Sequence, residues 1–159
     1  MTFPALVRFL YRKVWEADRA EDLAQEAFVR ALQHDPENPR AFVFTVAANL
    51  ARDEARTAIR RRKHLALVQA EQPLAAAESP ADDLERRERE RAVQAALGQL
   101  SERDREVLLL WDAGLDYDEI AKQTGLARSA IGTTLSRARR RLVEAHRGLD
   151  GRVGAGGGA

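Results

Sequence analysis

Arginine side chains recur at helical spacing in two separate parts of this 159-residue chain, and such side chains bind phosphates and guanine edges. Within 41–63 a polar stripe covers about a quarter of a helix circumference. Its members are Asn49, Arg52, Arg56, Arg60 and Lys63. At about 1.5 Å of rise per residue, the stripe runs for roughly 20 Å and can follow several phosphates. It predicts a nucleic-acid surface, and a solvated basic face is the plain alternative.

The second arginine group lies on a helix expected over 129–147. Its outer face comprises Thr133, Ser136, Arg137, Arg140 and Arg141, whereas Ile131, Leu135, Ala138 and Leu142 form its inner stripe. Two shorter helices should precede it, one capped by Ser101 and one capped by Asp116, and Gly125 supplies a tight turn. This order is typical of a helix-turn-helix that enters the DNA major groove. A helical hairpin with a solvated basic face is the alternative.

A different chemistry is expected on residues 20–32. One half of this helix is apolar and comprises Leu23, Ala24, Ala27, Phe28, Ala31 and Leu32. The other half comprises Asp22, Gln25, Glu26 and Val29. Two acids and an amide around a valine suit a protein partner better than water, although an ordinary solvated face would give a similar pattern.

These surfaces must be positioned by helices, because no convincing strand pattern occurs. We therefore predict an all-α fold of two small helical domains, the second a helix-turn-helix. The first domain should span 1–64 and contain a turn over 34–39, where two prolines stop any helix. A flexible linker is expected over 65–83, the second domain over 84–148, and a disordered tail over 149–159, which is glycine-rich from Gly151. In the helix expected over 102–111, the apolar face should contain Val107, Leu108, Leu110 and Trp111.

Composition narrows the classes of protein. Net charge is only +1, but acidic residues concentrate between the two basic segments, so each segment can bind a polyanion locally. Cysteine is absent, and no apolar run resembles a signal peptide or a membrane span, which favours a cytoplasmic protein without membrane insertion. The three histidines lie far apart in the sequence and suggest no catalytic or metal site. We expect no enzyme activity and no cofactor.

Taken together, these segments resemble the extracytoplasmic-function (ECF) sigma factors of bacterial RNA polymerase, within the sigma-70 family. Residues 20–28, AEDLAQEAF, look like the family's polymerase-binding helix. Residues 41–63, with AANL at 47–50, look like the helix that recognises the −10 promoter element. Residues 100–142 look like the domain that reads the −35 element.

The resemblance implies binding rather than catalysis: such a protein brings core polymerase to a promoter and initiates transcription. It implies that Asp22, Gln25, Glu26 and Val29 contact the clamp helices of the largest polymerase subunit. The residues implied at the −10 element are Arg40, Phe42, Asn49, Arg52, Arg56 and Arg60. Those implied at the −35 element are Arg128, Thr133, Thr134, Arg137, Arg140 and Arg141. Membership of this group also implies an anti-sigma factor as a partner.

This chain departs from the family pattern at several positions. It begins abruptly at Met1, so we expect a shortened first domain. Phe42 replaces a common tryptophan, and Ala127 stands where a capping serine is common. Gly132 lies within the expected recognition helix, where glycine costs about 1 kcal/mol. We expect a weaker or altered −35 contact.

Two other classes of protein would explain part of the pattern. A helix-turn-helix regulator that acts without core polymerase would need a sensing domain, which the helical first half does not offer. A pure interaction protein would use the acidic helix but leave both basic faces unexplained. Binding to core polymerase separates these alternatives from a sigma factor.

Overall fold

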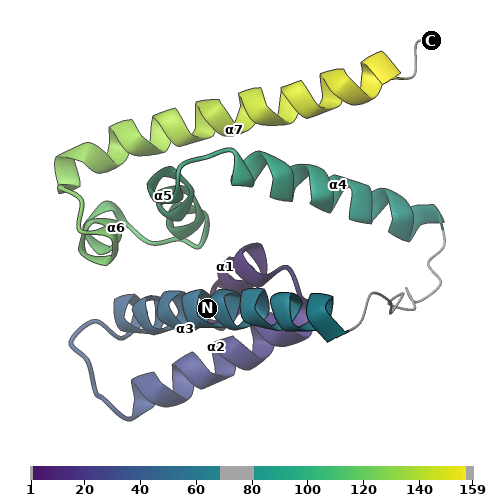
Figure 1. Ribbon diagram of the computed structural model, residues 1–159. Coiled ribbons are helices and arrows are strands. Elements are labelled where there is room, and N and C mark those ends of the chain that lie inside the picture. The colour runs from purple at the N-terminus through teal and green to yellow at the C-terminus, as the bar shows by residue number, and fades with distance from the viewer. Residues whose placement is uncertain (1, 69–80, 157–159) are drawn as a thin grey trace. The chain divides into compact units, whose positions relative to one another are not determined.

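The computed structural model describes the backbone of residues 2–68 and 81–156, and the side chains of residues 2–64 and 83–148. Within these ranges every regular element is a helix (Figure 1), which confirms the all-α prediction. The helices are α1 (Thr2–Val14), α2 (Ala17–Leu32), α3 (Pro39–Val68), α4 (Ala81–Gly98), α5 (Glu102–Asp112), α6 (Tyr117–Thr124) and α7 (Arg128–Gly156).

Contacts group the chain into two compact units, one of residues 2–68 with 109–125 and one of residues 81–108 with 126–156. This grouping follows contacts in space and divides α5, so the boundaries predicted along the sequence stay predictions. Helix continues to Val68 and resumes at Ala81, inside both ends of the predicted linker. Residues 69–80, the centre of that linker, lie outside the described residues.

In the first unit, α1, α2 and α3 pack against one another around a core of aromatic and small side chains. The rings of Phe9 and Phe44, both buried, meet edge to face with centroids 5.3 Å apart. Alanines dominate the buried faces of α2 and α3 and let the helices approach closely. They are Ala20, Ala24, Ala27, Ala31, Ala47, Ala48 and Ala51.

Local signals explain how the helices of this unit begin and end. Asn38 precedes α3 and its side-chain oxygen accepts a hydrogen bond from the backbone N–H of Ala41 at 3.1 Å. Pro39 then occupies the first helical position, which needs no N–H donor, so α3 begins two residues earlier than expected. α1 ends differently, because Trp15 adopts a positive φ of 60° without being glycine.

The caps predicted for α5 and α6 are confirmed. The Ser101 hydroxyl accepts a hydrogen bond from the backbone N–H of Asp104 at 3.1 Å, at the start of α5. Asp116 and Glu119 form a reciprocal capping box at the start of α6, with distances of 2.8 and 2.9 Å. Gly125 closes α6 with a φ of 76°, which an L side chain rarely adopts.

Two expectations about individual segments are wrong. Trp111 is 38% exposed and not part of a buried face, while Leu109, which the pattern omitted, is only 5% exposed. Leu32 is 82% exposed because it is the last residue of α2. Helix α7 continues as far as Gly156, and the disordered tail expected over 149–159 stays a prediction.

In the second unit, α4 packs against α7 (Figure 1). Buried side chains of both helices, of the turn before α5 and of the first half of α5 form its core. They are Ala96, Leu97, Leu100, Val107, Ile131, Leu135, Ala138 and Ala145. Among the described residues, no helix is long and apolar enough to cross a membrane.

Candidate nucleic-acid and partner interfaces

The outer face of α2 carries the residues predicted to bind a protein partner. Asp22, Gln25, Glu26 and Val29 are all exposed, and Val29 is exposed to 54%. Leu32 extends this face by a further exposed apolar side chain, at 82%. The spacing of Gln25, Val29 and Leu32 places them on one side of the helix, so the exposed surface is more apolar than the sequence predicted.

The acids of this face are paired with arginines of the same helix. Glu26 accepts from Arg30 at 2.7 Å, and Asp22 lies 3.4 Å from Arg19. Arg19 also binds Glu54 of α3, and this hydrogen bond raises the pKa of Arg19. Exposed pairs of this kind contribute little to stability, so both acids remain open to an exchange of partners.

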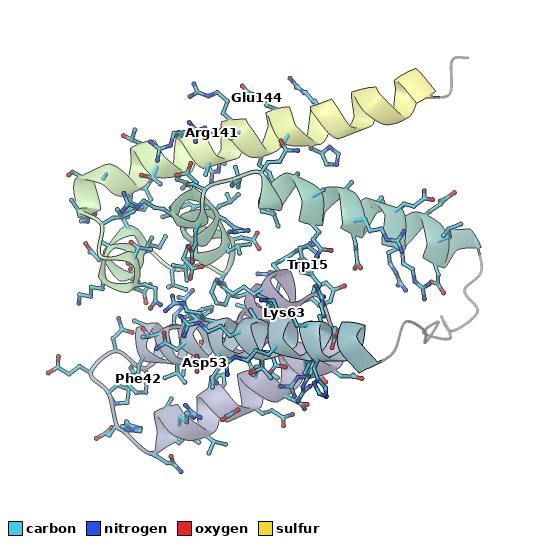
Figure 2. The ribbon with its side chains drawn as sticks, viewed as in Figure 1. Trp15, Phe42, Asp53, Lys63, Arg141 and Glu144 are labelled. Atoms are coloured by element: carbon cyan, nitrogen blue, oxygen red, sulfur yellow. The ribbon has the colours of Figure 1, made fainter. Side chains whose placement is uncertain are left out.

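The basic stripe of α3 lies on the surface as predicted from its spacing. Asn49, Arg52, Arg56, Arg60 and Lys63 are all exposed. Asp53, one residue from Arg52, also lies on α3, as does Lys63 near the far end of this helix (Figure 2). Asp53 lies three residues before Arg56 and seven before Arg60, so it borders the stripe and places one acid beside its four positive charges.

The start of α3 holds the two remaining residues predicted near the −10 element. Arg40 and Phe42 are both half-buried (Figure 2 labels Phe42). The Phe42 ring lies 5.5 Å from the ring of exposed His34, which belongs to the turn before α3. His34 is held through Nδ1, 2.7 Å from the carbonyl oxygen of Arg30. An aromatic ring at the surface can stack on an unpaired base, but the role of Phe42 in DNA binding stays a prediction.

The outer face of α7 carries a continuous polar stripe. Ser129, Thr133, Ser136 and Arg140 are exposed and follow one another at spacings of four, three and four residues. Arg128 and Arg141 are exposed as well. Thr134 is different: its side chain is 5% exposed, because it faces the inner side of the helix next to buried Leu135. Burial removes Thr134 from any surface that could contact DNA.

Arg137 is half-buried and bound to Asp104 of α5. Its Nη2 donates to Asp104 Oδ1 at 2.8 Å and its Nε donates to Oδ2 at 3.3 Å. Arg141 adds a longer hydrogen bond to Oδ2, at 3.4 Å. The hydrogen bond from Arg137 lowers the pKa of Asp104, and the positive charge of Arg141 lowers it further.

Asp104 is the functional candidate that sequence reasoning missed. Its side chain is 1% exposed, although aspartate is seldom buried without a partner. A signal was present: Asp104 lies three residues before Val107 and so shares the inner face of α5. Its partners follow 33 and 37 residues later, which no local pattern reveals.

A basic stripe on α3 and an acid-amide face on α2 are typical of a protein that binds both a nucleic acid and a protein partner. Comparison with known proteins defines that class further. The family described as Sigma-70 region 2 matches residues 2–63, and the family described as Sigma-70, region 4 matches residues 90–142.

Individual relatives agree with both matches. The ECF RNA polymerase sigma factor EcfG of Rhodopseudomonas palustris is 31% identical, over 87% of this chain and 77% of the relative. The probable RNA polymerase sigma factor RfaY of Xanthomonas campestris is 35% identical over 76% of this chain, which spans about a third (32%) of that longer protein. The sigma factor RpoE, solved with the anti-sigma factor NepR from Bartonella quintana, matches with a TM-score of 0.63 and 28% identity, over 92% of each chain.

The chain belongs to the sigma-70 family of RNA polymerase sigma factors, in the ECF group. As a sigma factor it binds core RNA polymerase and directs promoter recognition, and a regulator that acts without polymerase is not favoured. Sigma factors are initiation factors rather than catalysts.

Proposed function

We propose that three separate helix faces divide the work of this sigma factor. The exposed face of α2, with Asp22, Gln25, Glu26 and Val29, binds core polymerase. The α3 stripe binds the −10 element through Asn49, Arg52, Arg56 and Arg60, together with Arg40 and Phe42 at the start of the helix. The outer face of α7 binds the −35 element through Arg128, Thr133, Arg140 and Arg141.

One observation carries this proposal. The residues predicted to bind polymerase are exposed on an acidic and apolar face of α2. The residues of the basic stripe are exposed on α3. A basic stripe attracts phosphates over a length of several nucleotides. An exposed acid-amide face with Val29 repels DNA and suits a protein partner that offers basic and apolar groups.

Charge reversal separates the two faces. We expect Arg52→Glu with Arg56→Glu to abolish promoter opening and leave core binding unchanged, because these side chains face DNA. Arg61→Glu with Arg62→Glu is the matched control: both arginines are exposed on α3, on the side away from the stripe. Permanganate footprinting measures opening, and affinity for core polymerase is measured by fluorescence anisotropy.

The opposite result is expected for the acidic face. Asp22→Lys with Glu26→Lys should weaken core binding at least tenfold, while Glu85→Lys with Glu88→Lys on α4 makes the same charge change at exposed sites and should not. If the double substitutions on α2 and on α3 cause the same defect, the proposal that the two faces have separate functions is wrong.

We place the protein in the cytoplasm, where bacterial core polymerase acts. We also propose that an anti-sigma factor holds this chain inactive. The support is the related RpoE, which was solved in complex with the anti-sigma factor NepR. To test this, the tagged chain is purified from cells in which it does not activate transcription, and the proteins bound to it are identified by mass spectrometry. An inhibitory partner should be found bound in place of polymerase.

A further inference from the structure

A buried ion-pair cluster lies beneath the recognition helix. Asp104 stands in the first turn of α5, where its backbone N–H is held by Ser101, and its carboxylate faces α7. Arg137 and Arg141, one helical turn apart on α7, both reach this carboxylate. The cluster thus joins the start of α5 to two successive turns of α7.

The geometry of the main pair restricts the rotation of α7. Arg137 binds Asp104 through two nitrogens, Nη2 and Nε, to two different oxygens. A two-point contact between a planar guanidinium and a carboxylate defines an orientation as well as a distance. The faces that α7 presents to solvent, including Thr133 and Arg140, therefore depend on this pair.

The same geometry makes Arg137 a poor DNA contact. Its Nε and Nη2 donors are directed at Asp104, and leaving a buried carboxylate without partners is unfavourable. The exposed stripe of Ser129, Thr133, Ser136 and Arg140 borders Arg137, which is four residues from Thr133, so the pair with Asp104 holds an arginine at the edge of that stripe. Arg141, whose side chain is 53% exposed and whose bond to Asp104 is longer, keeps donors for other partners.

We propose that Arg137 is a positioning residue, which orients the DNA-reading face of α7 through its two-point contact with buried Asp104 and makes no phosphate contact itself. This inference rests on the proposed −35 role of α7. It reassigns Arg137, which the sequence placed among the DNA contacts, and adds Asp104, which no DNA could reach.

The direction in which Asp104→Asn changes the affinity for promoter DNA tests the proposal. Removing a negative charge near a DNA-binding helix strengthens binding if electrostatics alone decides, because Arg137 and Arg141 are then released toward phosphates. If the pair orients α7, Asp104→Asn should instead weaken promoter binding, by roughly five- to tenfold. The probe is a labelled promoter duplex that the wild-type holoenzyme transcribes in run-off assays on genomic fragments, bound by full-length sigma factor with core polymerase.

The salt dependence of DNA affinity distinguishes a lost phosphate contact from a structural defect, because a structural defect alone leaves this dependence unchanged. A residue that contacts phosphate contributes about one unit to the slope of log Kd against log salt. We expect Arg140→Gln to lower this slope by about one unit between roughly 50 and 200 mM salt. Arg137→Gln should raise Kd and leave the slope unchanged, and Arg137→Lys, which restores only one point of contact, should recover part of the affinity.

The outcomes separate this inference from the function on which it rests. A tighter complex with Asp104→Asn, or a slope lowered by Arg137→Gln as much as by Arg140→Gln, overturns the positioning role. Loss of affinity with Asp104→Asn and an unchanged slope with Arg137→Gln support it. If Asp104→Asn does not fold by circular dichroism, the Arg137 and Arg140 slopes decide alone. No effect of Arg140→Gln or Thr133→Ala on affinity would show that the proposed −35 role of α7 has failed.

Discussion

At Asp104, two arginines compensate one buried negative charge: Arg137 binds both carboxylate oxygens and Arg141 adds a longer bond, while the Ser101 hydroxyl accepts from the backbone N–H of Asp104. The position in the first turn of α5 also favours a negative charge, because the N-terminal end of a helix is partly positive. A charge satisfied in this way stabilises one arrangement of α5 and α7 over others. Its removal should therefore affect both stability and DNA binding.

The lowered pKa of Asp104 predicts how stability changes with pH. The unfolded chain has an aspartate pKa of about 3.9, above that of folded Asp104, so the unfolded state takes up the proton first as pH falls. The stabilisation is complete above the unfolded value and is lost as pH falls through the folded one. We expect the difference in unfolding free energy between wild type and Asp104→Asn to shrink from pH 6 to pH 3, measured by urea denaturation.

Arg137→Gln is the matched variant, because it removes the main cause of the shift while keeping the carboxylate. As for Asp104→Asn, its free energy of unfolding should fall less between pH 6 and pH 3 than that of wild type. Parallel loss of stability in wild type and both variants between pH 6 and pH 3 would contradict the assignment of the shift to this pair.

At the scale of elements, α5 and α6 begin at side-chain caps, whereas α7 does not. Ser101 caps α5 and the Asp116–Glu119 box caps α6, whereas α7 begins at Arg128 after Ala127, whose side chain offers no acceptor. The proposed reading helix therefore begins without a side-chain cap. A weaker start to α7 is consistent with the weaker −35 contact expected from the sequence.

Ala127→Ser should supply the missing cap. The new hydroxyl can accept a hydrogen bond from the backbone N–H of Ser129 or Ala130 and should stabilise the protein by about 1 kcal/mol. For a chain of this length the corresponding rise in Tm is about 2–4 °C, measured by thermal denaturation. Ala127→Val, which adds bulk without an acceptor, is the control. Equal effects of serine and valine would place the helix start elsewhere.

At the scale of the whole molecule, a sigma factor must hold polymerase and promoter at once through different surfaces. The α2 and α3 faces belong to one compact unit, and Glu54 of α3 binds Arg19 of α2 between them. The two helices pack against each other, and we expect a substitution on the exposed face of one to leave the other in place. This independence makes the two functions separable in one protein.

Because the two functions are separable, a variant that has lost only DNA binding should inhibit the wild-type protein competitively. The variant with Arg52→Glu and Arg56→Glu should still occupy core polymerase and, in about tenfold excess, suppress run-off transcription by wild type roughly tenfold by mass action. The variant with Asp22→Lys and Glu26→Lys should not compete at the same concentration. Inhibition by both variants, or by neither, would contradict separate polymerase and DNA faces.

Local chemistry determined where α5 begins and where α6 begins and ends. Ser101, Asp116 and Gly125 act on backbone groups within a few residues, and the regular spacing of Arg52, Arg56 and Arg60 already places them on one exposed side. The acid-amide face of α2 was predicted for the same reason. Such signals need only neighbours along the chain.

Tertiary structure decided which apolar and charged side chains are covered. Leu32 and Trp111 belong to apolar patterns yet are exposed, while Asp104 and Thr134 are polar yet buried, because burial depends on which helix packs alongside. The partners of Asp104 are 33 and 37 residues distant, so only the packing of α5 against α7 could bring them together. Contacts between such distant residues leave no periodic pattern in the sequence. For this reason only the structure could distinguish an arginine that orients the helix from one that faces DNA.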